Sequence, residues 1–155
     1  MRKRFPTRSM RAEKGFTLIE VIIAMALLAI VAVAILAGLS TGSRAIFVAD
    51  ERATAESLAR SQMEYVKNLN VGYVKAPTGG EASYANAKIS VPPGYEIRSI
   101  NRAGVEDVST NIVAVPWDSS RNQPAPDDAG LQKIKLVIYH HGKSLLTLEG
   151  YKVDR

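Results

Sequence analysis

The stretch Lys14-Gly15-Phe16-Thr17-Leu18-Ile19-Glu20-Val21 lies between two segments of opposite character. Before it the chain is basic, with six Lys and Arg residues and one Glu within residues 1–15. After it, the run from Val21 to Ser43 has no charged residue and consists mostly of Ala, Ile, Leu, Val and Met. A helix of about 20 such residues crosses the hydrocarbon core of a bilayer. The sequence therefore predicts one membrane helix with an ionisable group, Glu20, at its start, and such groups mark functional sites by default.

The string Gly15-Phe16-Thr17-Leu18-Ile19-Glu20 resembles the processing and N-methylation motif of type IV prepilins and pseudopilins. In that family a membrane-embedded peptidase cuts after the glycine and methylates the new amino terminus. The resemblance covers about residues 11–40. It implies cleavage after Gly15, an N-methylated Phe16, and Glu20 as the fifth residue of the mature chain. It also implies that the Glu20 carboxylate guides assembly by pairing with the terminal amine of a neighbouring subunit.

The physical properties of these residues agree with that chemistry. A glycine before the cut lets an extended backbone approach a protease without a side chain in between. The basic leader keeps the amino terminus cytoplasmic, because Lys and Arg beside a span resist translocation. Cleavage at Gly15 leaves the apolar run on the protein, whereas a secretory signal peptide loses its apolar core. In lipid the low dielectric strengthens the attraction between an amine and Glu20.

Two other interpretations of the N-terminal segment remain open. The run could be an uncleaved signal anchor, with Glu20 extending its carboxylate to the membrane interface. It could also be a secretory signal that is cut near Ala32-Val33-Ala34 or Ala37. In both cases the string from Gly15 to Glu20 would have no function.

Composition narrows the function of the remaining chain. The sequence pI is about 9.6, but the leader alone carries a net charge of +5, the formal net charge of the whole chain. Residues 16–155 are therefore neutral and lack the basic surface that nucleic-acid binding requires. There is no cysteine. Many type IV pilins close a C-terminal loop with a disulfide, so its absence favours a minor pilin or a pseudopilin. No catalytic or cofactor motif is evident, which predicts that the chain is not an enzyme.

The helix is expected to continue past the membrane to about Asn70. Gly38 and the cluster Ser40–Ser43 indicate either a hinge or the boundary between lipid and water. Beyond Arg44 an apolar face is predicted, formed by Ala55, Leu58, Ala59, Gln62, Val66 and Leu69. Another face carries Arg52, Glu56, Arg60 and Glu64, charges of alternating sign at i, i+4 spacing. Each such pair stabilises a helix by only about 0.2–0.5 kcal/mol, so a solvated ladder of ion pairs is expected there, or charged contacts between subunits.

The rest of the chain predicts a small antiparallel sheet. Strands are expected at Ala87–Val91, Tyr95–Ile100 and Ile112–Val115, the last ending at Pro116. Two alternating runs, Leu131–Tyr139 and Ser144–Val153, flank a short connection that contains Gly142, which predicts a hairpin. Ile134, Leu136 and Ile138 should face the core, with Leu146 and Leu148 opposite them.

Three features suggest sites only weakly. The segment from Asp118 to Gly130 contains Asp127 and Asp128, but its spacing matches no calcium loop, so a solvated turn is favoured over a metal site. His140 and His141 are neighbours in the predicted turn and lack further ligands. Trp117, the single tryptophan, is expected to anchor the core beside the sheet.

The sequence thus predicts an α+β, pilin-like subunit in four parts. These are a basic leader at 1–15, a membrane-spanning or filament-core helix at 16–43, its amphipathic continuation at 44–70, and an antiparallel sheet domain at 71–155. The long helix should pack on the sheet. A filament subunit needs no metal and no cofactor.

The predicted role is structural, in a type IV pilus, a type II secretion pseudopilus or a competence pseudopilus. Expected partners are the prepilin peptidase/methyltransferase, other pilin or pseudopilin subunits, the inner-membrane assembly platform and membrane lipid, with no nucleic acid as primary partner. The chain should cross the bacterial cytoplasmic membrane once, with the sheet domain extracytoplasmic, and then enter a filament. The alternative is an extracytoplasmic binding or enzymatic domain that is anchored by a prepilin-like signal.

Overall fold

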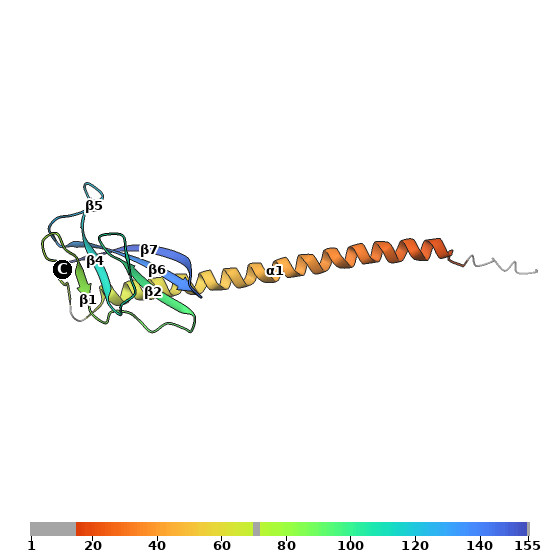
Figure 1. Cartoon of the computed structure of the whole chain (residues 1–155), viewed down its shortest axis with the longest axis horizontal. Coiled ribbons are helices and arrows are strands. Elements are labelled where there is room, and N and C mark those ends of the chain that lie inside the picture. The colour runs from red at the N-terminus through yellow and green to blue at the C-terminus, as the bar shows by residue number, and fades with distance from the viewer. Residues whose placement is uncertain (1–14, 70–71, 155) are drawn as a thin grey trace, which may run out of the picture. The chain divides into compact units, whose positions relative to one another are not determined.

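The computed structural model describes residues 15–69 and 72–154, and the basic leader apart from Gly15 lies outside this range. One long helix, α1 (Leu18–Lys67), precedes seven strands (Figure 1). The chain divides into two compact units, residues 1–45 and 46–155, which are considered separately. The predicted helix is confirmed, and its end at Lys67 falls three residues before the predicted position.

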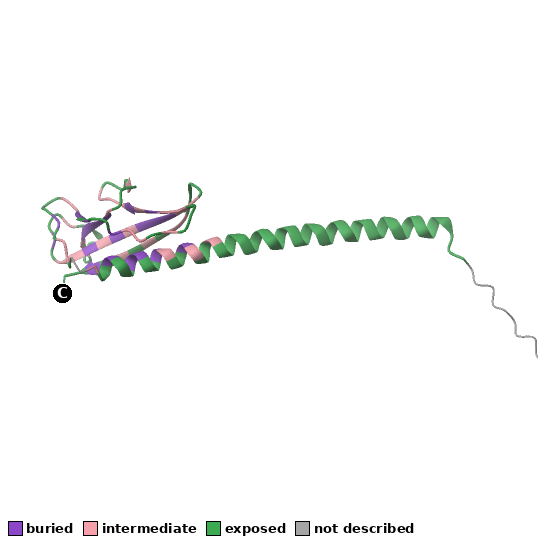
Figure 2. Ribbon diagram, turned by 90° about the horizontal axis from the view of Figure 1, so that it is seen from below, coloured by how far each residue is buried: buried purple, intermediate pink, exposed green. Residues whose placement is uncertain are grey.

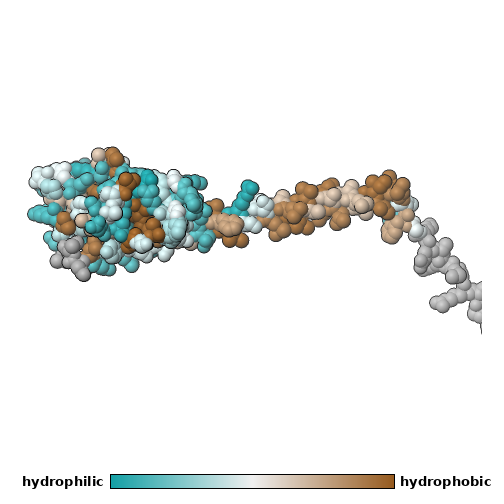
Figure 3. All heavy atoms as spheres, turned by 60° about the horizontal axis from the view of Figure 1, so that its bottom comes forward, coloured by the Kyte–Doolittle hydropathy of each residue, from teal (hydrophilic) through white to brown (hydrophobic). Residues whose placement is uncertain are grey.

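The part of α1 that belongs to the first unit is apolar on all sides and fully exposed (Figures 2 and 3). Among the described residues, α1 is the one helix that is long and apolar enough to cross a membrane. It passes through Gly38 and the Ser40–Ser43 cluster without a break. The hydroxyls of Thr41 and Ser43 donate to the carbonyl oxygens of Ala37 and Leu39, at 3.0 Å each. These polar groups are thus satisfied within the helix, as an apolar environment requires.

The second unit contains the C-terminal part of α1 and an antiparallel sheet of seven strands. The strands are β1 (Ala82–Tyr84), β2 (Tyr95–Ile100), β3 (Glu106–Asp107), β4 (Ile112–Asp118), β5 (Gln123–Pro124), β6 (Leu131–His140) and β7 (Lys143–Val153). Their order is β1-β4-β6-β2-β3, with β5 on β4 and β7 on β6. The central strand, β6, therefore pairs with β2, β4 and β7.

The hairpin β6–β7 confirms the clearest prediction made from the sequence. Its loop is His141-Gly142, with φ values of +48° and +77°. Two successive residues with positive φ define the type I′ turn, which matches the twist of the flanking strands. The register then pairs Leu136 with Leu148 and Ile138 with Leu146, and a β-bulge follows Ile138.

The core lies between one face of this sheet and the C-terminal turns of α1. The helix contributes Ala55, Ala59, Gln62, Met63 and Val66, all buried. The sheet contributes Ile134, Leu136 and Ile138, each with no exposed surface. Leu146 and Leu148 are half-buried and pack against this cluster. The predicted apolar faces of helix and hairpin are thus confirmed, except that Met63 was missed.

Small residues bring the helix close to the sheet. Ala55 and Ala59 stand in the buried helix face, and Gly150 on β7 lies directly under Met63. A Cβ atom at Gly150 would lie 2.6 Å from the Met63 sulfur atom, too close for real side chains. The thioether of Met63 thus occupies the space that a side chain at position 150 would need.

The predicted strand at Ala87–Val91 is wrong. The strand in this region is β1, five residues earlier, and it pairs with β4. Residues 87–91 instead bond to the helix: the Gln62 amide donates to the Ala87 carbonyl oxygen at 2.6 Å and accepts from the Ile89 N–H at 2.9 Å. A buried side chain thus replaces the neighbouring strand that the alternating pattern suggested.

Two further predictions differ from the structure. Strand β4 runs through Pro116 to Asp118, because Pro116 falls where β4 exchanges partners, between its pairing with β6 and its pairing with β5. Proline is tolerated where its missing N–H breaks no continuous ladder. Trp117 lies half-buried on the side of the sheet opposite α1, not in the core. The register explains this, because β4 alternates and buries Ile112 and Ala114 on the helix side.

Candidate processing and assembly site

The predicted cleavage site lies in non-helical chain immediately before α1. Residues Gly15 to Thr17 are not helical, and α1 begins at Leu18. The Thr17 carbonyl oxygen accepts the N–H groups of Glu20 and Val21, at 3.1 and 3.3 Å. Its hydroxyl also accepts the Glu20 N–H, at 3.3 Å. Thr17 is therefore the N-cap of the helix, and its spacing to Glu20 is that of a capping box. This role was not predicted from the sequence, although the pattern Thr-x-x-Glu before an apolar run indicates it.

Gly15 and Phe16 are both open to an enzyme. A Cβ atom at Gly15 would meet no described atom within 4 Å, and Phe16 is 81% exposed. The fold therefore does not itself require glycine at position 15. Any need for glycine there comes from the enzyme that binds this segment.

Glu20 lies in the first turn of α1 and is exposed. It borders a shallow apolar hollow together with Phe16, Val21 and Met25. A carboxylate in a first turn is stabilised by the helix dipole. Within residues 15–69 and 72–154, no cationic side chain lies within 4 Å of the Glu20 carboxylate. This part of the chain thus leaves the carboxylate free to bind a cation from outside.

The charged faces of α1 do not form the expected ladder. Arg52, Glu56, Arg60 and Glu64 are all exposed. In the described part of the chain, no ion pair joins two of these four side chains. They are available to solvent or to another molecule.

In the Asp118–Gly130 segment, Asp128 is held by donors of the protein itself. Asp128 is buried and accepts hydrogen bonds from the Tyr73 hydroxyl, the Ala76 N–H (2.8 Å), the Gln132 amide (2.6 Å) and the Gly130 N–H (3.0 Å). Burial raises the pKa of this carboxyl, but these hydrogen bonds outweigh burial and leave the pKa below its ordinary value. Among the described residues, no three His, Cys, Asp or Glu side chains cluster as metal ligands would.

Asp128 therefore provides a pH-dependent prediction. We expect Asp128→Asn to lower the free energy of unfolding at pH 7 by about 2 kcal/mol, since hydrogen bonds to a charged group contribute about 1.5–3 kcal/mol each. A carboxyl group whose pKa is lower in the folded state than in the unfolded state stabilises the fold at pH values above its unfolded pKa. This stabilisation is lost as the pH falls through the pKa of the folded state. The gap between wild type and variant should therefore shrink below the ordinary pKa of 3.8. Urea titrations of a fragment beginning at Arg44, at several pH values, measure this. A gap that stays constant down to pH 2 would contradict it.

The hairpin tip contacts α1 through His140 and the segment before β2 through His141. His140 stacks on Tyr95 with ring centroids 4.3 Å apart, and its Nδ1 lies 3.5 Å from a Glu51 carboxylate oxygen. His141 donates its N–H to the Gly94 carbonyl oxygen at 2.9 Å. These contacts fix the turn against the helix.

Lys152 joins the last strand to the end of α1. It is 5% exposed, and its ammonium donates to the Val66 carbonyl oxygen at 2.6 Å and to that of Lys67 at 3.3 Å. Burial lowers the pKa of this lysine. A cation at this position satisfies the last carbonyl groups of the helix. This contact was not predicted from the sequence, although Lys152 shares the inward-facing register of Leu146 and Leu148.

The comparisons with known proteins concern the N-terminal segment. Residues 10–36 match the family described as the prokaryotic N-terminal methylation motif. The match includes Gly15, Phe16 and Glu20. No curated protein and no solved structure matches the chain.

Fold and motif together define a pilin-like chain with α+β architecture, a long apolar N-terminal helix and a small antiparallel sheet. It carries the prepilin-type signature, and this supports a processed subunit of the type IV pilin or pseudopilin kind. The motif implies a prepilin peptidase and other pilin subunits as partners, and it points to a structural protein. The apolar helix fits anchoring in the inner membrane.

Proposed function

We propose that the protein is a minor pilin or minor pseudopilin of a type IV pilus or a type II secretion pseudopilus. Its apolar helix carries the proposal. The eighteen-residue apolar segment of α1 that is suited to cross a membrane has none of its residues buried against the rest of the chain. Such a surface needs lipid before assembly and neighbouring subunits afterwards, because exposed apolar area is unfavourable in water. Processing at the methylation motif, at the start of this helix, would come between the state in lipid and the assembled state.

In this proposal the prepilin peptidase cuts between Gly15 and Phe16 and methylates the Phe16 amine. The mature chain crosses the inner membrane once, and its sheet domain is extracytoplasmic. Glu20 then attracts the terminal amine of a neighbouring subunit at the assembly platform. The exposed position of Phe16 and the absence of a cationic partner for Glu20 within the described residues support these roles.

Processing is tested by the mass of the mature amino terminus. We expect the mature chain to begin at methylated Phe16, and we expect Gly15→Leu to abolish cleavage in cells. Because no described atom lies near a Cβ atom at position 15, this substitution cannot act by disturbing the fold. Loss of cleavage would thus report on enzyme recognition alone.

The same measurement separates the alternatives. A mature terminus within residues 32–45 would indicate an ordinary signal peptide and would contradict the pilin interpretation. An intact leader in cells that process other prepilins would indicate a signal anchor. Ile46→Ala, an exposed substitution on α1 beyond the matched residues 10–36, serves as the control and should be processed normally.

A further inference from the structure

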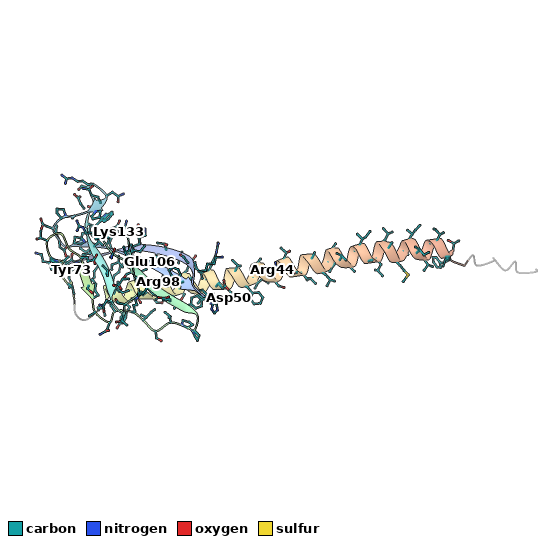
Figure 4. The ribbon with its side chains drawn as sticks, in the orientation of Figure 1. Arg44, Asp50, Tyr73, Arg98, Glu106 and Lys133 are labelled. Atoms are coloured by element: carbon teal, nitrogen blue, oxygen red, sulfur yellow. The ribbon has the colours of Figure 1, made fainter. Side chains whose placement is uncertain are left out.

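The face of the sheet opposite α1, here called the outer face, contains a hollow of about 210 Å³. Its apolar wall is formed by Ile100, Val115, Trp117 and Pro124. Its polar rim consists of Asn101, Arg102, Lys133, Lys135 and Glu149. These residues come from five strands and the loop after β2, and Lys133 is marked in Figure 4. Pockets with an apolar wall and a few converging polar groups are the usual form of small-ligand sites.

Trp117 is the reason to consider this hollow functional. Large aromatic side chains normally contribute to stability by burial, yet the single tryptophan lies half-buried on the open face of the sheet. The Lys133 ammonium lies 4.2 Å from the ring centroid. That contact alone has a structural explanation, since a cation over an indole is mildly stabilising. It does not account for the open apolar wall beside the ring.

The charges around the hollow favour an anion. Three cations, Arg102, Lys133 and Lys135, meet one carboxylate, Glu149. The Lys133 ammonium lies 2.7 Å from one carboxylate oxygen of Glu149. The Lys135 ammonium lies 3.4 Å from the other oxygen, and the Lys135 side chain is 41% exposed. The pairing with Lys133, aided by Lys135, keeps the pKa of Glu149 low. Lys135 is therefore the cation best able to meet an incoming anionic group.

The Arg102 side chain builds one wall rather than acting as a free charge. Its guanidinium donates to the carbonyl oxygens of Ala125 and Gly80, at 2.8 and 3.3 Å. Its backbone N–H donates to the Glu81 carboxylate at 2.9 Å. These bonds join three loops around the hollow, so its shape is fixed before a ligand arrives. The guanidinium still contributes positive charge there.

The rim offers acceptors as well as donors, which narrows the class of ligand. The Asn101 side-chain oxygen accepts the Val105 N–H at 2.8 Å, so its amide nitrogen remains as a donor. The Glu149 carboxylate is an acceptor beside the cations. A simple anion would gain nothing from a carboxylate. A ligand with an anionic group, several hydroxyls and an apolar ring face would use the whole set.

We propose that this hollow binds an acidic sugar unit, a uronic acid of a polysaccharide, with its ring against Trp117 and its carboxylate toward Lys135. The hydroxyls of the sugar would meet Glu149 and Asn101. This binding activity goes beyond the proposed structural function and does not depend on it. The site lies on the outer face, so packing of α1 against the sheet leaves it open.

The single tryptophan makes the test direct, because all indole fluorescence of the chain comes from this site. The full-length protein in nanodiscs of neutral lipid is titrated with a trimer of galacturonic acid. Matched titrations use the methyl-esterified trimer, which keeps the rings but lacks the charge, and a trimer of glutamate, which keeps the charge but lacks the rings. We expect a saturable fluorescence change with the galacturonate trimer, and affinities at least about tenfold weaker for the other two.

Variants locate the binding. Lys135→Gln should weaken the galacturonate affinity by about tenfold, the loss of one charge-assisted contact. Lys143→Gln removes the same charge at the exposed hairpin tip and should leave the affinity unchanged. Unchanged thermal melting of both variants shows that the fold is intact. Should Lys135→Gln melt early, Asn101→Ala in the loop after β2 takes its place, with the same expected direction.

Three results would overturn the proposal. Equal binding of the glutamate trimer would show that negative charge alone accounts for the binding and that the hollow does not recognise a sugar ring. Equal binding of the esterified trimer would show that the cations do not select the ligand. Absence of a saturable change with all three probes would show that the hollow has no such ligand.

Discussion

Leu136→Asp is expected to unfold the sheet domain. Leu136 lies at the centre of β6, has no exposed surface and faces Leu148 across the hairpin. An aspartate there would place a carboxylate in the apolar core without a partner. Removing a charge from water without compensation costs several kcal/mol, and a small domain is stable by only about 5–15 kcal/mol. Thermal melting of a fragment beginning at Arg44 should show no cooperative transition for this variant.

A graded set of substitutions makes this result specific. Leu148→Asp should destabilise less, because Leu148 is half-buried at the edge of the core. Thr147→Asp, one residue earlier on β7 and exposed, serves as the control and should melt close to wild type. If Leu136→Asp and Thr147→Asp melted alike, the assignment of the two faces of β6 and β7 would be wrong.

The hairpin shows what the sequence alone can predict. Alternation of apolar and polar residues fixes which side chains face the core, and Gly142 fixes where the chain reverses, so both strands were found with nearly correct ends. The same holds for Tyr95–Ile100, which forms β2 with the predicted bounds. Alternation and turn residues are local signals, because each can be recognised from a few neighbouring residues in the sequence.

The errors arise where a distant partner determines the structure. Residues 87–91 have strand-like alternation, yet they bond to Gln62, a side chain 25 residues away in sequence from Ala87. Trp117 was placed in the core because tryptophan is usually buried, but the register of β4 turns it to the outer face. Lys152 caps a helix that ends 85 residues before it. Periodicity can assign a residue to one face of an element, as it does for Lys152, but it does not identify the distant residue that the side chain contacts.

The N-terminal site is a different case. Its chemistry is carried by a contiguous string, so the sequence predicts it, and residues 10–36 match the methylation motif. The structure adds the N-cap at Thr17, and among the described residues Gly15 has no neighbour that requires glycine. The function proposed for Glu20 depends on another subunit. It therefore requires an experiment on assembly.

Glu20→Ala is expected to abolish assembly while preserving insertion and processing. The substitution removes the only charge between Phe16 and Ser43, so entry of the helix into lipid becomes easier. The bond between Gly15 and Phe16 is unchanged, and Thr17 still caps the helix. What is lost is the carboxylate that a neighbour's terminal amine would meet in a medium of low dielectric, where such a pairing is strong.

Further substitutions at position 20 distinguish the effect of the charge of the side chain from the effect of its size. Glu20→Gln keeps the size and hydrogen bonding of the side chain but not its charge, and it should fail as Glu20→Ala does. Glu20→Asp keeps the charge on a shorter arm and should be intermediate. Asp50→Ala removes another exposed carboxylate from α1, outside both the apolar run and the charged face from Arg52 to Glu64, and should assemble normally. The readouts are crosslinking of processed subunits in membranes and the number of filaments or the amount of secreted cargo. Processed Glu20→Ala that crosslinks to partner subunits as wild type does, with filaments and secretion unchanged, would show that this carboxylate does not guide assembly.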